Sequence, residues 1–186
     1  QRARTSGHNP NDYIVERLEC YSHDGKLIPI TVSRHKNTKI DGTANLLLYG
    51  YGSYGSSMWP GFSSTRFSLI NRNIIWVTAH IRGGMEKGMK WWKEGKLLNK
   101  KNTFEDYISV AKYLINEKYT SEGKIIGMGG SAGGLLIESF GTSIINSIIW
   151  DNFPNQISDG EDYPLNLACN YSNIEGGHQG VGIGNI

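Results

Sequence analysis

Three short apolar runs that each lead into glycine constrain the fold of this chain more than any other feature of its sequence. The runs are 45–49, which stops at Gly50, 74–79, which leads to Arg82-Gly83-Gly84, and 125–128, which stops at Gly129-Gly130. Continuous apolar runs of this length, bounded by turn formers, are typical of strands that a sheet buries on both faces. The sequence therefore predicts a sheet whose buried strands end in tight glycine turns.

The segments between these runs predict helices and the order of the elements. Residues 63–71 favour a short helix between the first two strands, and a capping pattern at Thr103 predicts the start of a longer amphipathic helix before the third. Upstream, two β-rich runs at 13–20 and 27–32 flank Asp24-Gly25, which favours a tight antiparallel hairpin in which both of these residues take positive φ. A hairpin followed by alternating strands and helices indicates a doubly wound α/β fold with a mostly parallel sheet.

Length, charge and cysteine content limit the partners, cofactors and cellular location that we expect for this protein. The 186 residues are enough for one domain with a real core, and the net charge of +2 comes from scattered basic residues, so we expect neither nucleic acid nor a membrane as a partner. Cys20 and Cys169 lie far apart without metal-ligand spacing, so we expect no metal, no disulfide framework and a cytoplasmic location. No run is long enough for a membrane span, and no nucleotide fingerprint with its acidic partner is present, so we expect no cofactor.

One motif carries chemistry. Gly129-Gly130-Ser131-Ala132-Gly133 follows a predicted strand and leads into a stretch that can start a helix, which is the context of a G-x-S-x-G nucleophile elbow. Such a turn exposes the serine hydroxyl, and the flanking glycines let strand and helix approach closely. Ser131 is thus the candidate nucleophile, and the Ala132 N–H is a candidate oxyanion donor. The alternative is a glycine-rich turn with a purely structural role.

Four ordered blocks of the sequence resemble the catalytic domain of the prolyl oligopeptidase family of serine peptidases, and most closely its oligopeptidase B branch. The blocks are 47–55 (LLYGYGSYG), 79–84 (AHIRGG), 95–104 (GKLLNKKNTF) and 129–136 (GGSAGGLL). The resemblance implies an α/β-hydrolase fold and hydrolysis of short peptides through an acyl-enzyme on Ser131. It also implies cleavage after basic residues, although the two acidic residues that the branch places after the Tyr-Gly block are absent from 56–61.

The resemblance assigns further residues to the site. Tyr51 matches the tyrosine whose hydroxyl completes the oxyanion hole beside the Ala132 N–H, with a packing aromatic as the structural alternative. Tyr54 falls where the family has an aromatic that lines the pocket for the substrate residue before the scissile bond. Arg82 is expected to pair with a carboxylate inside the fold, and His80 to be a core histidine.

The base and the acid of the triad are harder to assign. His178 lies in a Gly-His-Gln-Gly stretch that resembles the family's histidine loop, so it is the candidate base. It follows Ser131 by only 47 residues, whereas the strand–helix units that precede the base in this fold need about 30 residues each. Asp159 and Asp162 are the nearest carboxylates, and neither matches the family's aspartate.

These features predict how the chain is divided. We expect a shortened α/β-hydrolase domain: 1–12 as a linker from an absent propeller, 13–140 as the N-terminal part of the catalytic domain, and 141–186 as a divergent C-terminal remnant.

The leading function is a serine peptidase. The alternative is a catalytically inactive remnant or binding module, because a serine without its base loses activation. An esterase or lipase is less favoured, since 50–53 (GYGS) replaces the H-G-G-G block of those enzymes.

Overall fold

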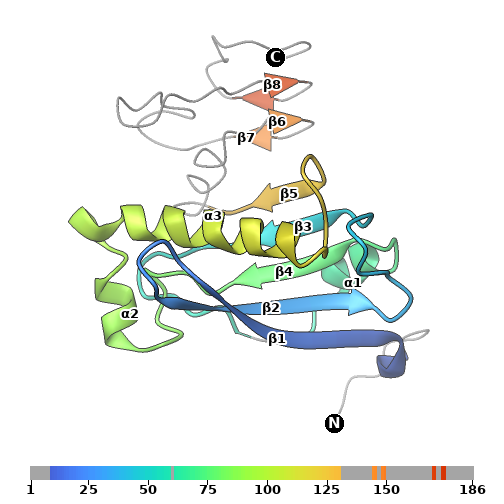
Figure 1. Ribbon diagram of the computed structural model, residues 1–186, viewed down its shortest axis with the longest axis horizontal. Helices are drawn as coiled ribbons and strands as arrows, with labels where there is room; N and C mark the ends of the chain where they lie inside the picture. Colours follow the sequence, from blue (N-terminus) through green and yellow to red (C-terminus); the bar gives the residue numbers. More distant parts are fainter. Residues whose placement is uncertain are drawn as a thin grey trace.

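The computed structural model describes residues 9–59 and 61–130, together with four two-residue strands farther along the chain. Its main feature is a five-stranded sheet in the order β1-β2-β4-β3-β5 (Figure 1). The five strands are β1 (Tyr13–Tyr21), β2 (Leu27–His35), β3 (Leu46–Tyr49), β4 (Ile75–Ala79) and β5 (Ile125–Met128). The two-residue strands form two parallel pairs, β6 (Ile144–Ile145) with β8 (Cys169–Asn170), and β7 (Ile148–Ile149) with β9 (Asn173–Ile174).

An antiparallel hairpin forms one edge of the sheet, as the sequence predicts. After the short 3-10 helix η1 (Pro10–Asp12), β1 pairs with β2 in a register that sets Tyr21 opposite Leu27. The turn differs from the predicted two-residue type, because Gly25 has φ +77° while Asp24 does not take positive φ. Gly25 N donates to Ser22 O at 3.0 Å, so the loop is His23-Asp24-Gly25 with glycine alone in the left-handed region.

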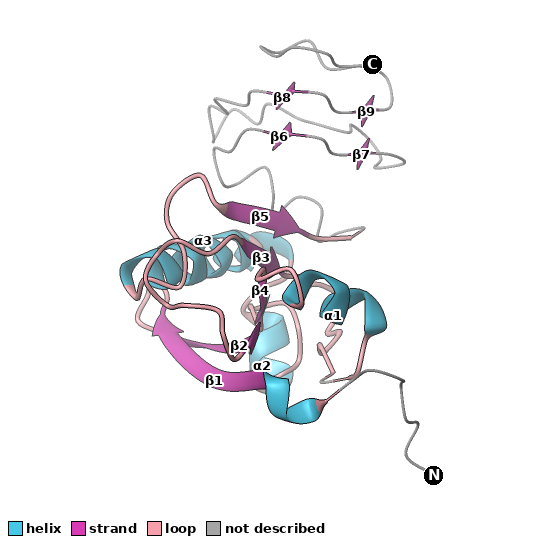
Figure 2. Ribbon diagram, turned by 90° about the vertical axis from the view of Figure 1, so that its right-hand side faces the viewer, coloured by secondary structure: helices cyan, strands magenta, loops and turns pink. Residues whose placement is uncertain are grey.

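The centre of the sheet is parallel, and helices connect its strands. β3 lies between β4 and β5 and runs parallel to both, while β2 joins β4 in antiparallel fashion. Helix α1 (Ser64–Ile70) connects β3 to β4, and α3 (Lys101–Asn116) follows β4 and precedes β5. Figure 2 shows α1 and α3 on opposite faces of the sheet. The predicted α/β class and parallel strand order are therefore confirmed.

The hydrophobic core lies between the sheet and α3. Fully buried apolar side chains come from alternate positions of the strands and from one face of the helix; they include Ile30, Val32, Leu46, Leu48, Ile75, Val77, Tyr107, Val110 and Leu114. Tyr107 Oη donates to Leu48 O at 2.6 Å, which satisfies its hydroxyl within the core. Burial raises the pKa of that phenol well above its ordinary range.

The face of the sheet toward α1 is more open, which corrects one expectation. Trp76 stacks on Tyr49 with centroids 6.2 Å apart, and the guanidinium of Arg66 lies over the Trp76 ring. On β5, however, Ile126 is 52% exposed and Met128 is 44% exposed, so this strand is not buried on both faces as predicted. Both side chains lie on the α1 face, because their register partners on β3 are Leu47 and Tyr49. Helix α1 packs mainly against β4 and β2, which leaves this part of β5 open.

The start of α3 and the elements before it also differ from the sequence prediction. Thr103 lies inside the first turn of α3 instead of capping it, because the helix begins at Lys101 after an N-cap residue, Lys100, that makes no side-chain cap bond. The Thr103 hydroxyl instead contacts Arg82 O at 2.8 Å and Gly95 O at 3.1 Å. The short helices α2 (Met89–Lys93) and η2 (Leu97–Asn99) were not predicted, since neither is long enough to show a period.

Candidate active site

Three turns meet where the parallel strands end. β3 is followed by the turn 50–55, called the Tyr51 turn below, β4 by the turn 80–84, and β5 by Gly129 and Gly130. The ends of β3 and β5 are adjacent, since Tyr49 pairs with Met128 and Gly50 N donates to Met128 O at 3.1 Å. The predicted site residues Ser131, Ala132 and His178 lie outside the described residues, as do Asp159 and Asp162. The structure therefore positions the Tyr51 turn and the two glycines that lead to Ser131.

The turn after β3 holds two tyrosines near each other. The ring centroids of Tyr51 and Tyr54 are 6.5 Å apart, with planes tilted by 46°. Tyr54 is 78% exposed and takes φ 55°, a left-handed conformation that is uncommon for a residue with a side chain. The Tyr51 side chain is partly buried, and its hydroxyl makes no hydrogen bond with any residue in 9–59 or 61–130.

Glycines from three separate segments allow the turns to pack backbone against backbone. Gly52 has φ +61°, and a Cβ there would collide with Thr103 Cγ2 and lie 2.8 Å from Ile81 Cγ1. A Cβ on Gly83 would collide with Gly52 O, and one on Gly95 with Gly83 N. The turns at these three glycines are tight, as the sequence predicts, because a side chain at any of them would collide with a neighbouring segment.

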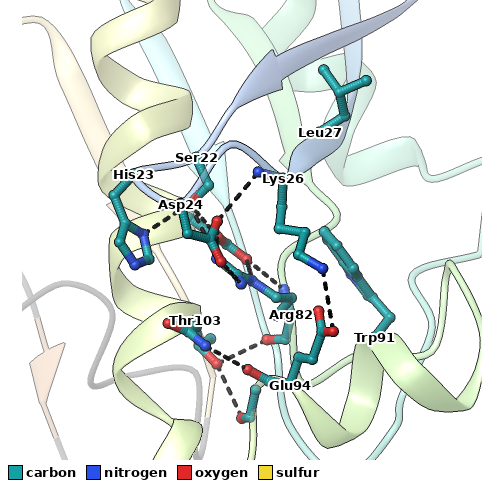
Figure 3. A network of polar contacts seen from close by, with 12 residues as sticks. Ser22, His23, Asp24, Lys26, Leu27, Arg82, Trp91, Glu94 and Thr103 are labelled. Carbon is teal, nitrogen blue, oxygen red and sulfur yellow. Dashed lines mark hydrogen bonds and ion pairs between the residues drawn. The ribbon is translucent and has the colours of Figure 1, made fainter.

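A buried arginine fixes the turn after β4, as Figure 3 shows. Arg82 is only 1% exposed, and its Nε and Nη2 donate to the two carboxylate oxygens of Asp106 at 2.8 and 2.6 Å. Asp24, in the hairpin loop, accepts from both terminal nitrogens of the same guanidinium. Burial alone lowers the pKa of Arg82, but its bonds to Asp106 and Asp24 outweigh burial and raise it. The predicted pairing of Arg82 with a carboxylate inside the fold is confirmed.

His80 is a core histidine, as predicted, and its neighbour Glu86 connects two turns. The His80 ring is 4% exposed, and Nε2 lies 2.8 Å from Thr31 Oγ1. Nδ1 faces Glu86 Oε1 at 3.6 Å and makes no hydrogen bond within the described part of the chain. Glu86 Oε1 accepts from Met58 N at 2.9 Å. Burial raises the pKa of Glu86, but its contacts with His80 and the Met58 N–H lower it below its ordinary value.

Lys100 contacts the same turn and was given no role from the sequence. Its Nζ donates to Gly52 O at 2.6 Å and to Ser53 Oγ at 2.8 Å. The sequence marks the block 95–104 only through the family resemblance, and no local pattern indicates a different role for Lys100 than for the adjacent Lys101. Only the fold brings Lys100 to a turn 47 residues earlier in the chain.

The described residues contain no cluster of three or more metal-ligating side chains. Among the helices of the same residues, none has the length and apolar character that a bilayer crossing requires.

Comparison with known proteins points to the same family as the sequence blocks. Residues 60–143 match the model of the prolyl oligopeptidase family. Dipeptidyl aminopeptidase BI from Pseudoxanthomonas mexicana is 48% identical over 132 residues, which are 70% of this chain and 18% of that protein. Protease 2 from Moraxella lacunata is 44% identical over 138 residues, covering 74% of this chain and 20% of that protein. The chain thus spans about a fifth of the length of these relatives.

Solved structures agree with the sequence matches. The structure of oligopeptidase B from Leishmania major superposes with a TM-score of 0.70 at 34% identity, over 90% of this chain and 21% of that one. A post-proline cleaving enzyme from Rickettsia typhi gives a TM-score of 0.70 at 30% identity, over 76% of this chain and 22% of that one. The sheet order, the glycine turns and the ordered sequence blocks are therefore those of an α/β-hydrolase catalytic domain, and the chain belongs to the prolyl oligopeptidase family.

Proposed function

We propose that this chain carries the nucleophile and the oxyanion hole of a serine peptidase that cleaves short peptides. Ser131 is the nucleophile, Tyr51 Oη and the Ala132 N–H form the oxyanion hole, and Tyr54 contacts the substrate residue before the scissile bond. One observation carries most of the proposal: the parallel pairing of β3 with β5 sets the Tyr51 turn beside the glycines that lead to Ser131. Active sites of open α/β sheets lie at this carboxyl edge of the strands.

The chemistry follows from these roles. Ser131 Oγ attacks the carbonyl carbon of the scissile peptide while its proton passes to a base, for which His178 is the candidate. The negative charge that develops on the carbonyl oxygen is stabilised by the phenol and the backbone N–H, and each such donor contributes about 10²–10³ in rate. Collapse of the tetrahedral intermediate expels the amine, which takes the proton from the base, and water then hydrolyses the acyl-enzyme.

Cleavage after arginine or lysine is a finer part of the same proposal and rests on similarity to protease 2 and oligopeptidase B. Two described carboxylates beside the turns of the site already have partners: Glu86 contacts His80 and Met58 N, and Asp106 binds Arg82. Neither is proposed to recognise a basic substrate side chain. The separation of the two cysteines supports a reducing, cytoplasmic setting.

The same proposal divides the chain at about residue 140. Residues 13–140 would form the N-terminal part of the hydrolase domain, in agreement with a family match that ends at residue 143, and 141–186 a divergent remnant. Residues 1–12 would serve as a linker.

A second candidate function is an inactive, binding form of the domain. The spacing of 47 residues between Ser131 and His178 favours it, because that length leaves too little chain for the strand–helix units that normally carry the acid and the base. In that case Ser131 would be exposed without a base, and peptides would bind without turnover.

Labelling by a fluorophosphonate probe, combined with hydrolysis of an arginyl fluorogenic dipeptide, separates the two candidates. The peptidase proposal expects labelling and cleavage by the 186-residue chain, both lost in Ser131→Ala and strongly reduced in His178→Ala. Labelling that disappears in Ser131→Ala but persists in His178→Ala, with no cleavage, would support the inactive form. Absence of any Ser131-dependent labelling would contradict the assignment of the nucleophile.

A further inference from the structure

We infer that Lys100 is a positioning residue for Tyr51: from the start of α3 it fixes the turn that carries the oxyanion tyrosine. The inference rests on the role proposed above for Tyr51, and it adds a residue that acts through the turn without touching the substrate. Three observations support it: the contacts of the Lys100 ammonium, the unfavourable place in which this lysine lies, and the absence, within the described residues, of a hydrogen bond to the Tyr51 hydroxyl.

The contacts of Lys100 are short and directed at the turn itself. Nζ donates to the carbonyl of Gly52, the residue directly after Tyr51, at 2.6 Å, and to Ser53 Oγ at 2.8 Å. Ser53 is buried, so its hydroxyl is held in place by protein atoms. Hydrogen bonds from a charged donor are shorter and about twice as strong as those between neutral groups. A single side chain therefore links the first turn of α3 to two consecutive residues of the Tyr51 turn.

Local rules disfavour a lysine at this position. Lys100 occupies the N-cap of α3, where the helix dipole repels a cation, and it forms no cap hydrogen bond. The side chain is partly buried, and within the described residues no carboxylate lies within 4 Å of its Nζ; the Phe104 ring lies 5.9 Å away. Burial lowers the pKa of Lys100 to about 8. Residues that break local rules are most often found where function requires them.

Among the described residues, the Tyr51 side chain is held through its turn. Its hydroxyl makes no hydrogen bond within 9–59 or 61–130, and its ring lies beside that of Tyr54, which belongs to the same turn. That turn packs against Arg82 and Gly83, with Gly55 N donating to Gly83 O at 2.9 Å, and farther on Met58 N donates to Glu86. From the α3 side, Lys100 supplies the hydrogen bonds. Misplacing a catalytic group by about 1 Å can reduce the rate about 10²-fold.

Three variants of the 186-residue chain test the inference: Lys100→Met, which removes charge and donor, Lys100→Arg, which keeps both, and Lys112→Met as a matched control. Lys112 is an exposed lysine on the same helix. Amide hydrogen exchange of residues 50–56 is measured first, since it needs no activity. We expect exchange there to speed up at least about tenfold in Lys100→Met and to stay unchanged in Lys112→Met, because a lost hydrogen bond from a charged donor is worth at least that factor.

The rate of fluorophosphonate labelling is measured second, alone and in a Tyr51→Phe background. We expect Lys100→Met to reduce the rate about 10–100-fold, Lys100→Arg to restore part of it, and Lys100→Met to add little once Tyr51 has lost its hydroxyl. If Lys100→Met instead reduces the labelling rate by the same factor with Tyr51 as with Tyr51→Phe, the link to Tyr51 is overturned. A general loss of stability would give that result, because it acts in either background. Unchanged exchange in residues 50–56 would overturn the positioning role itself. If the unmodified chain is not labelled at all, the proposed function fails, and the exchange result still decides whether Lys100 holds the turn.

Discussion

At the scale of single residues, the site depends on glycines whose importance lies in what touches them. Gly25 and Gly52 both have positive φ, but a Cβ on Gly25 would meet nothing within 4 Å, whereas one on Gly52 would meet Thr103, Ile81 and Arg82. We expect Gly25→Ala to lower the free energy of unfolding by about 1–2 kcal/mol through backbone strain alone. Gly52→Ala should lower it by about 1–3 kcal/mol more, because overpacking adds to the same strain.

Urea unfolding midpoints of the two variants measure this difference directly. Similar midpoints for Gly25→Ala and Gly52→Ala would mean that the turn after β3 can relax away from Thr103 of α3, which would contradict the close packing at Gly52. The glycine-rich composition indicated tight turns, but it could not indicate which glycines meet. The contacts of Gly52, Gly83 and Gly95 join segments that only the fold brings together.

At the scale of elements, the start of α3 connects the helix to the site. Thr103 Oγ1 lies within hydrogen-bond distance of Arg82 O and Gly95 O, both in the turns that pack around Gly52. Thr103→Val keeps the shape and removes the hydroxyl, so it should destabilise the fold by about 1–3 kcal/mol, the usual penalty for leaving a buried acceptor without its donor. Thr103→Ser keeps the hydroxyl and loses one methyl group, which should cost only about 1 kcal/mol.

Thermal or urea unfolding of both variants distinguishes the two contributions. A larger loss in Thr103→Ser than in Thr103→Val would show that the methyl group, packed near Gly52, matters more than the hydrogen bonds.

The same threonine shows where prediction from the sequence succeeds and fails. Local patterns were enough to predict the hairpin, the three parallel strands, α1 and most of α3: short apolar or β-rich runs bounded by turn formers for the strands, and helical spacing of apolar residues for α3. The start of α3 was misplaced because a threonine before an acidic residue is typical of a cap, while here its hydroxyl contacts carbonyls from distant turns. The helix α2 escaped prediction because five residues give no measurable period.

At the scale of the whole molecule, the topology explains how far the site could be predicted. Motifs that follow parallel strands must meet at one edge, so the sequence was sufficient to expect the Tyr51 turn beside the glycines before Ser131. It was not sufficient to find Lys100, which contacts this turn from the start of α3, or Glu86, which contacts Met58 N just after it. The positions of the strands follow from patterns along the chain, whereas the contacts of Lys100 and Glu86 depend on how the elements pack in three dimensions.

Two carboxylates give the fold as a whole a dependence on acid. Burial raises the pKa of Asp24, but its bonds with Arg82 and Lys26 N hold it below the ordinary 3.8, and contacts with His80 and Met58 N likewise hold that of Glu86 below 4.5. Groups with a lowered pKa in the folded state bind fewer protons than in the unfolded state, so their contribution is present above the unfolded values. We therefore expect the urea midpoint to be steady from pH 7 to about 5 and to fall as pH decreases through 4.5 and 3.8.

The variants Asp24→Asn and Glu86→Gln check the origin of this loss. At pH 7 each should be less stable than the unmodified chain, and the difference should shrink toward pH 3, because protonation removes the same charge that the substitution removes. Glu105→Gln serves as the control, since Glu105 lies in α3 and its carboxylate makes no hydrogen bond or ion pair within the described residues. A difference that stays constant from pH 7 to pH 3 would show that Asp24 and Glu86 stabilise the fold through shape and neutral hydrogen bonds instead of through their charge.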